Sequence, residues 1–197
     1  MKIEQFVMAY QVEQDRVRAM LPEGFTSLRP VLRINAEIRD DRAAYLEFNA
    51  PVAGFGKSGW LNIAHWQTPE TDMTWERVGE TVTFHLPFLE IMFTGVGVMG
   101  GCPAEGSNEG CFFPADDGYR LVPPERIDSR KEFCDCTFTW EFAPGDAHGV
   151  SIGEKIVGVT AEESQKSYPR VELTAPGAAA LPCLRMLGQY KVIFERT

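Results

Sequence analysis

Features that would place this sequence in several common classes of protein are missing from it. It contains no run of 18 or more apolar residues, so no segment predicts a membrane-spanning helix. Residues 1–4 are not followed by the apolar core of a signal peptide. Basic clusters are lacking too, since the longest is Arg130-Lys131 and the net charge is −9. An acidic chain gains no counterion release from a polyanion, so we expect a soluble cytoplasmic protein with no nucleic acid and no membrane among its partners.

Side chains suited to a metal site are scarce. The number of cysteines is odd and the chain has no export signal, which argues against a disulfide framework. The five are Cys102, Cys111, Cys134, Cys136 and Cys183. Only Cys134 and Cys136 are closely spaced, and no C-x-x-C or H-x-x-x-H pattern supplies two further ligands. The glycine-rich stretch at residues 94–101 lacks the spacing of a nucleotide-binding loop. We therefore predict free thiols, no metal and no cofactor.

Signals of hydrolytic catalysis are weak as well. The chain has three histidines, and its serines lack a G-x-S-x-G setting, so nothing predicts a Ser-His-Asp triad. His148 lies in a Gly-Asp-Ala-His-Gly turn, which is typical of a surface residue. His65 and His85 fall in strand-like segments, where each could be either a structural histidine with satisfied hydrogen bonds or a site residue.

What the sequence does contain is alternation of apolar and polar residues, the pattern of half-buried β-strands. Six segments show it with varying clarity: residues 31–38, 81–88, 134–142, 152–159, 170–174 and 189–194. Helical spacing occurs at residues 13–20, where Val17, Met20 and Leu21 recur at i, i+3 and i+4 before Pro22 ends the pattern. A second helix is expected at residues 178–187.

The order of these elements predicts the fold class. No strand–helix alternation builds parallel units and no repeat occurs, while 44% hydrophobic residues suffice for one core, so residues 1–197 should form a single domain. We predict a mainly antiparallel β (α+β) fold with two or three short helices, closed into a barrel or strongly curved. Residues 100–131, rich in Gly, Pro and acid, predict a long excursion that could cover a site.

A hairpin at residues 44–66 carries the most informative side chains. Tyr45, Glu47 and Asn49 alternate with apolar residues, and a second extended run follows a glycine-rich turn. Alternation places these three side chains on one face, where a curved sheet could direct them into a cavity. A solvated strand face is the alternative reading of the same pattern.

The order of features along the chain resembles that of acetoacetate decarboxylase. In that family a tyrosine and a short helix ending in a Leu/Val-Pro step precede an Arg-x-Glu strand, a Tyr-x-Glu strand and a glycine-turn hairpin. The stretches that carry the resemblance are YQVEQDRVRAMLPEGF, PVLRINAEI, YLEFNAPVAGFGKSGWLNIAHW, YPRVELTAPGAAALPCL and QYKVIFERT. Most of the chain is covered, and residues 100–160 match poorly.

The resemblance implies a curved antiparallel fold of the cone or barrel kind with a small apolar cavity, often in a homo-oligomer. It implies that the Tyr-x-Glu carboxylate is Glu47 and that Asn35 replaces the Arg-x-Glu carboxylate. The family's Schiff-base lysine, which attacks a β-keto acid, has no match, because Phe88 and Leu89 follow Pro87 where two lysines belong. Schiff-base decarboxylation is therefore expected to be absent.

Two hypotheses of function follow. In the first, the protein is an enzyme with lyase-like activity on a small keto acid or carbonyl compound, in which Glu47 is the acid/base and His85 or His65 assists. The residues expected to contact that substrate are Arg33, Asn35, Tyr45, His65, Trp66 and Phe88. In the alternative, a non-catalytic relative binds a small molecule, or Phe88, Trp66 and Phe84 fill the cavity. A pocket beside Glu47 would favour the first hypothesis and a filled interior the second.

Overall fold

The chain folds almost entirely into β-structure. The computed structural model describes residues 1–87, 89–98, 108–125, 127, 129, 132–141, 155–157 and 184–197. These contain one helix, α1 (Gln14–Met20), and a 13-stranded sheet. The strands are β1 (Lys2–Gln11), β2 (Phe25–Ser27), β3 (Val31–Arg39), β4 (Ala43–Gly54), β5 (Lys57–Gln67), β6 (Thr74–Val78), β7 (Thr81–Leu86), β8 (Leu89–Val98), β9 (Cys111–Ala115), β10 (Gly118–Val122), β11 (Glu132–Glu141), β12 (Lys155–Val157) and β13 (Arg185–Glu195).

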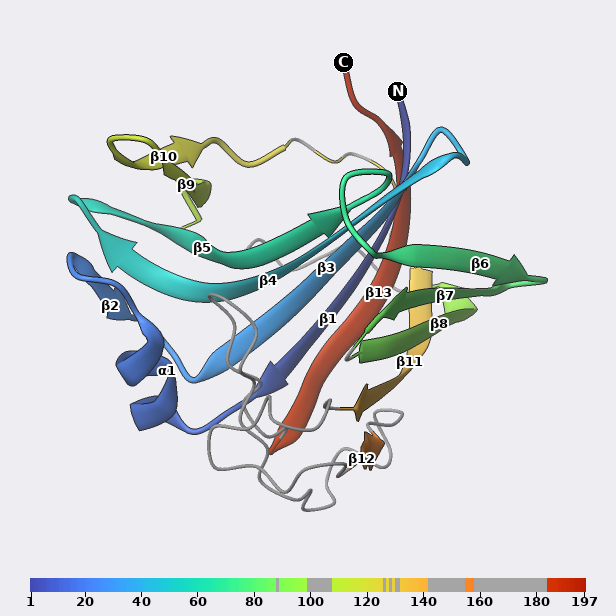
Figure 1. Cartoon of the computed structure of the whole chain (residues 1–197), viewed down its shortest axis with the longest axis horizontal. Helices are drawn as coiled ribbons and strands as arrows, with labels where there is room; N and C mark the ends of the chain where they lie inside the picture. The colour runs from blue at the N-terminus through green and yellow to red at the C-terminus, as the bar shows by residue number, and fades with distance from the viewer. Residues whose placement is uncertain are drawn as a thin grey trace.

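The strands follow the order β10-β9-β5-β4-β3-β1-β13-β11-β8-β7-β6, while β12 pairs with β11 and β2 with β4. Every pair is antiparallel except β5 with β9. The first and last strands therefore lie side by side in the middle of the sheet. Figure 1 shows both termini at one end of the molecule, from which the long strands β3, β4 and β5 fan out and bend.

Alternation along β1, β3 and β4 gives the sheet two chemically different faces. One face carries the main apolar core, which also includes side chains from β7 and β8: Phe6, Met8, Tyr10, Leu32, Ile34, Ala36, Ile38, Leu46, Phe48, Ala50, Val82, Phe84, Leu86, Leu89, Ile91 and Phe93. The opposite face of β3 and β4 carries polar residues, among them Arg33, Asn35, Glu37, Tyr45 and Glu47. The alternation predicted from the sequence is confirmed for these strands.

The β4–β5 hairpin forms as expected at its glycine-rich turn. Phe55 and Gly56 lie at the tip with positive φ values of 54° and 75°. Such φ values favour a turn that matches the twist of the flanking strands. The ring of Phe25 packs edge-on against Phe55, Phe112 and Tyr119, so a second apolar cluster joins this hairpin to β9 and β10.

Helix α1 is the helix predicted at residues 13–20. It buries Val17 against the main core and ends before Pro22, which cannot continue the helical hydrogen bonding. With seven residues it is too short to be stable alone, so its stability comes from that contact.

Several details differ from the sequence prediction. The sheet does not close into a barrel among the described residues, because β10 and β6 end the path without pairing to each other. The second helix was expected at 178–187, yet residues 185–187 belong to β13; the rest of that segment, like the strand expected at 170–174, lies outside the described residues. Only one helix occurs in the described part of the chain. Within residues 100–131, β9 and β10 were missed because their short runs lack clear alternation.

None of the helical structure among the described residues is long and apolar enough to span a membrane.

Candidate functional site

A pocket of about 740 Å³ lies against the polar face of the sheet. Its floor comes from β1, β3 and β4: Gln5, Val7, Arg33, Asn35, Glu37, Arg39, Tyr45 and Glu47. Trp60, Tyr190 and Arg196 add to its walls. The remaining wall is the described part of the expected excursion, from Asn108 to Ile127, and includes Cys111, Phe113 and Glu125. The floor is charged and polar, while the walls add apolar side chains such as Trp60, Phe113 and Ile127.

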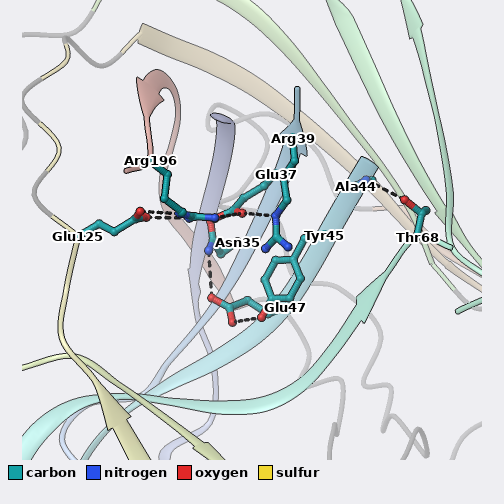
Figure 2. A network of polar contacts seen from close by, with 9 residues as sticks. All are labelled: Asn35, Glu37, Arg39, Ala44, Tyr45, Glu47, Thr68, Glu125 and Arg196. Carbon is teal, nitrogen blue, oxygen red and sulfur yellow. Dashed lines mark hydrogen bonds and ion pairs between the residues drawn. The ribbon is translucent and has the colours of Figure 1, made fainter. Parts of the chain in front are cut away.

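Glu47 lies buried in this floor and accepts three hydrogen bonds. Asn35 Nδ2 donates to Oε1 at 3.0 Å, while the Tyr45 hydroxyl and Asn62 Nδ2 donate to Oε2 at 2.6 and 2.7 Å. Antiparallel register explains the first contact, since Asn35 is the cross-strand partner of Glu47. Figure 2 shows Asn35 and Tyr45 on either side of the carboxylate. These neutral donors fix the orientation of the carboxylate toward the pocket.

A β-bulge brings Asn62 into the same network. The register of β4 and β5 shifts between Phe48 and Asn49, so that Ile63 is an extra residue between Asn62 and Ala64. A bulge changes which face the following side chains point to. His65, the register partner of Glu47, and Asn62 therefore meet although they are three positions apart, with His65 Nδ1 3.1 Å from Asn62 Oδ1.

The Tyr45 hydroxyl is a permanent donor to Glu47. Burial, together with the charge of Glu47 and the hydrogen bond to it, raises the pKa of Tyr45 far above its ordinary value. The phenol therefore stays protonated at neutral pH. The Arg39 guanidinium also lies over the Tyr45 ring, with its central carbon 4.3 Å from the ring centre.

A second carboxylate, Glu37, is held by two cations. Arg196 donates two hydrogen bonds to it at 2.8 and 3.1 Å, and Arg39 Nε donates a third at 2.9 Å. Arg196 also donates to Glu125 at 2.5 and 2.7 Å and so joins the pocket floor to the excursion (Figure 2). Burial opposes ionisation of Glu37, but the hydrogen bonds and charges of Arg196 and Arg39 outweigh it and lower its pKa.

The far end of the pocket is formed by Arg33, Trp60 and Cys111. Arg33 stacks on the Trp60 ring at 3.9 Å and donates to Asn49 Oδ1 at 3.1 and 3.0 Å. Asn49 in turn lies 3.8 Å from the Cys111 sulfur. Burial, with the negative charge of Glu47 adding to it, raises the pKa of the Cys111 thiol to about 12, so this thiol is not an activated nucleophile.

The structure brings together four of the eight residues predicted from the sequence. Arg33, Asn35, Tyr45 and Glu47 all line the pocket. His65 does not line the pocket: it is exposed, and its ring stacks on Tyr45 with 5.9 Å between the ring centres.

The other predicted residues lie elsewhere. Trp66 packs against Phe48 on the apolar face, because it is one residue out of phase with His65. His85 lies on β7 beside Glu90, 3.2 Å away, and does not line the pocket. Phe88 lies outside the described residues.

Sequence reasoning missed Glu37, Arg39, Asn62, Cys111, Glu125 and Arg196. Arg39 and Glu37 continue the alternating face that holds Arg33 and Asn35, so the strand pattern did contain a signal for them. Arg196 and Glu125 carried no local signal, since each is placed by contacts with residues far along the chain.

No lysine with a described side chain lines the pocket. Lys57, at the hairpin tip, is paired with Glu109 at 2.7 Å. Lys191 alternates with the pocket residue Tyr190 and points to the other face, where its Nζ lies 4.0 Å from Glu4. Within the described residues, no three His, Cys, Asp or Glu side chains gather as metal ligands.

Similar folds occur among the solved structures of known proteins. No family model matches the sequence, and no curated protein matches it. Among solved structures, the enduracididine biosynthesis enzyme MppR complexed with pyruvate is similar at 14% identity, with a TM-score of 0.54 over 98% of this chain and 84% of that one. An acetoacetate decarboxylase is similar at 13% identity, with a TM-score of 0.53 over 98% and 84%. The enzyme of that name from Legionella pneumophila has 12% identity and a TM-score of 0.50 over 98% and 81%. The resemblance to acetoacetate decarboxylase is thus confirmed as a resemblance of fold.

Proposed function

We propose that this protein binds a small keto acid in the pocket beside Glu47 and that Glu47 transfers protons to and from it without a Schiff base. The observation that supports this most is the position of Glu47, a buried carboxylate held by three neutral donors in the floor of the pocket. Arg39, on the same floor, has two terminal amino groups without a hydrogen-bond partner among the described residues. Such a group can bind a carboxylate through two parallel hydrogen bonds.

The chemistry available to Glu47 is proton abstraction next to a carbonyl group. Its carboxylate takes a proton from the carbon beside the ketone, the electron pair of that C–H bond forms a new C=C bond, and the π pair of the C=O bond moves onto the carbonyl oxygen. The positive charges of Arg39 and Arg33 favour the resulting enolate. Return of the proton to carbon regenerates the Glu47 carboxylate. In a lyase-like reaction the enolate expels a neighbouring group, and Glu47 is regenerated by giving its proton to that leaving group. Arg33 and Asn35 then orient the substrate, and His65 supports Tyr45 by ring stacking and Asn62 by the contact of its Nδ1 atom.

The similar folds are consistent with this substrate class. Pyruvate is bound by MppR, a protein of the same fold, and it is itself a small keto acid. At 14% identity this likeness extends to the fold alone. The keto acid assigned to the present chain therefore depends on the pocket and needs its own test.

The test is exchange of the methyl protons of pyruvate in deuterated water, followed by proton NMR. Wild-type protein should accelerate exchange, and Glu47→Gln should slow it at least about 100-fold, because general base catalysis typically contributes that much. His85→Gln is the control, since His85 does not line the pocket and exchange should be unchanged. Equal exchange by Glu47→Gln and wild type, with both folded by thermal unfolding, would exclude Glu47 as the base.

A non-catalytic binding protein is the second candidate. Both carboxylate oxygens of Glu47 already accept hydrogen bonds from the protein, so the carboxylate can form part of a binding pocket without acting as a base. In that case isothermal titration calorimetry would detect pyruvate binding, while deuterium exchange would remain at the rate of the protein-free solution.

A further inference from the structure

The three buried glutamates of the described residues differ in one respect. Glu4, Glu37 and Glu47 are 5%, 3% and 4% exposed. Glu4 is bonded to Arg77 and lies 4.0 Å from Lys191, and Glu37 is bonded to Arg39 and Arg196. Within the part of the chain that the structure describes, Glu47 forms no ion pair with any lysine, arginine or histidine.

A buried carboxylate without a cation is costly. Removing an ion of this size from water carries a penalty of several kcal/mol, which neutral donors offset only in part. The fold satisfies this requirement at Glu4 and Glu37 with its own cations. At Glu47 it supplies three neutral donors and a pocket, so the position that a cation would fill is the pocket itself.

A neighbouring acceptor is also unsatisfied. Asn35 uses Nδ2 to hold Glu47, which leaves its Oδ1 atom buried and without a hydrogen-bond partner among the described residues. A carboxylate without a cation and an amide oxygen without a donor therefore belong to neighbouring residues of the same pocket floor. A primary ammonium group has three N–H donors and no acceptor, which suits this arrangement.

A positive charge lies near Glu47 in the same pocket. Arg39 lies over the Tyr45 ring, and the hydroxyl at the end of that ring is bonded to Glu47. Arg39 and Glu47 are thus separated by one phenol side chain and face the same pocket. A small molecule with a carboxylate at one end and an ammonium group at the other would meet both.

We infer that the ligand of this pocket is zwitterionic, with a carboxylate bound by Arg39 and an ammonium group bound by Glu47. This inference extends the proposed function. It rests on that proposal for the carboxylate group of the ligand, and it adds the ammonium group. The class of ligand is a short amino acid or an amino-substituted keto acid.

The experiment is a calorimetric comparison of matched probes. Propanoate, lactate and alanine differ only in having hydrogen, hydroxyl or ammonium on the second carbon, and 3-hydroxypropanoate and β-alanine extend the series by moving the group one carbon further. At least one amino acid should bind about tenfold more tightly than its hydroxy and unsubstituted counterparts, the usual gain of a charge-assisted hydrogen bond. Equal affinities within both series would overturn the inference.

Two variants locate the effect. Glu47→Gln should abolish the preference for the amino acid over its hydroxy and unsubstituted counterparts. Glu125→Gln is the matched control, since Glu125 also lines the pocket but already has Arg196 as its partner, and this variant should keep the preference. A preference that survives in Glu47→Gln would contradict the assignment. Failure of the proton-transfer proposal would appear separately, as the absence of pyruvate exchange.

Discussion

At the scale of single residues, the polar face of β3 and β4 holds buried charged side chains, and these need partners from other parts of the chain. Glu37 and Glu47 follow the same alternation, yet one receives two arginines and the other only neutral donors. The difference arises from Arg196, which reaches Glu37 from the end of the chain. Removal of a cation from Glu37 and removal of a neutral donor from Glu47 should therefore have different consequences.

The first prediction concerns Arg196→Gln. Loss of its hydrogen bonds to buried Glu37 should lower the free energy of unfolding by about 1–3 kcal/mol at pH 7, as for other hydrogen bonds to charged groups. Arg18→Gln is the control, because the Arg18–Asp15 pair is exposed and should contribute less than about 1 kcal/mol. Urea unfolding of both variants measures this, and equal losses would contradict a buried role for Arg196.

The same variant has a defined pH dependence. The pKa of Glu37 is lowered in the folded protein, so its ion pair contributes stability above the ordinary pKa of a glutamate and loses it as the pH falls through the lowered value. The difference between wild type and Arg196→Gln should be full near pH 7 and shrink below about pH 4. A difference that stays constant to low pH would show that Glu37 is not responsible.

The second prediction concerns the absent nucleophile. Schiff-base chemistry needs a lysine amine that a substrate carbonyl can reach, and none of Lys2, Lys57 and Lys191 lines the pocket. The protein should neither decarboxylate acetoacetate nor gain mass when acetoacetate and borohydride are added together. Intact-mass spectrometry is the measurement. A stoichiometric adduct on a single lysine would show that a lysine elsewhere in the chain performs the reaction.

At the scale of elements, the pocket depends on how closely β9 approaches β5. Gly59 allows this approach, since a Cβ atom there would lie 2.2 Å from the carbonyl oxygen of Gly110. The backbone contact aligns Trp60 with Cys111, and both residues line the pocket. The β9–β10 hairpin and the residues after it can form the pocket wall only while this contact holds.

The third prediction follows for Gly59→Ala. The added methyl group would force β9 away from β5, which should cost about 1–3 kcal/mol of stability and weaken binding of pyruvate. Gly188→Ala is the control, because no atom lies within 4 Å of a Cβ there and stability should change by less than about 1 kcal/mol. Chemical unfolding and calorimetry measure the two effects. Similar behaviour of the two variants would mean that β5 and β9 separate without cost.

At the scale of the whole molecule, the sheet ends in two strands, β10 and β6, that have a partner on one side only among the described residues. Exposed apolar residues also occur along the last strand and next to it, including Leu184, Leu187 and Ile193. Unpaired strand edges and exposed apolar side chains are features through which copies of a chain associate.

The fourth prediction is that the protein forms a homo-oligomer through this carboxy-terminal region. Sedimentation equilibrium should give a mass that is a multiple of 22.0 kDa, and Leu187→Glu should reduce it by placing a charge in the interface. Glu195→Gln, an exposed change on the same strand, should leave the mass unchanged. A mass of one chain at all concentrations would contradict the prediction.

Much of the strand content could be predicted from the sequence, because side chains alternate with a period of two on any strand. This periodicity alone assigns Arg33 and Asn35 to one face of their strand and Tyr45 and Glu47 to one face of the next, and all four line the pocket. It could not separate the function of His85 from that of His65, since each alternates equally well on its own strand. The β9–β10 hairpin was missed because its strands of five residues show no clear period.

The sequence by itself determined which side chains share a face of a strand without a bulge, where the helix ends and which chemical groups are absent. Only the tertiary structure decided which strands are neighbours, and with them the partners of each buried charge. Arg196 meets Glu37 across 159 residues of chain, and Asn62 reaches Glu47 because one bulge shifts the register. Local periodicity contains no information on register or on long-range pairing, since both depend on how the whole sheet packs and bends.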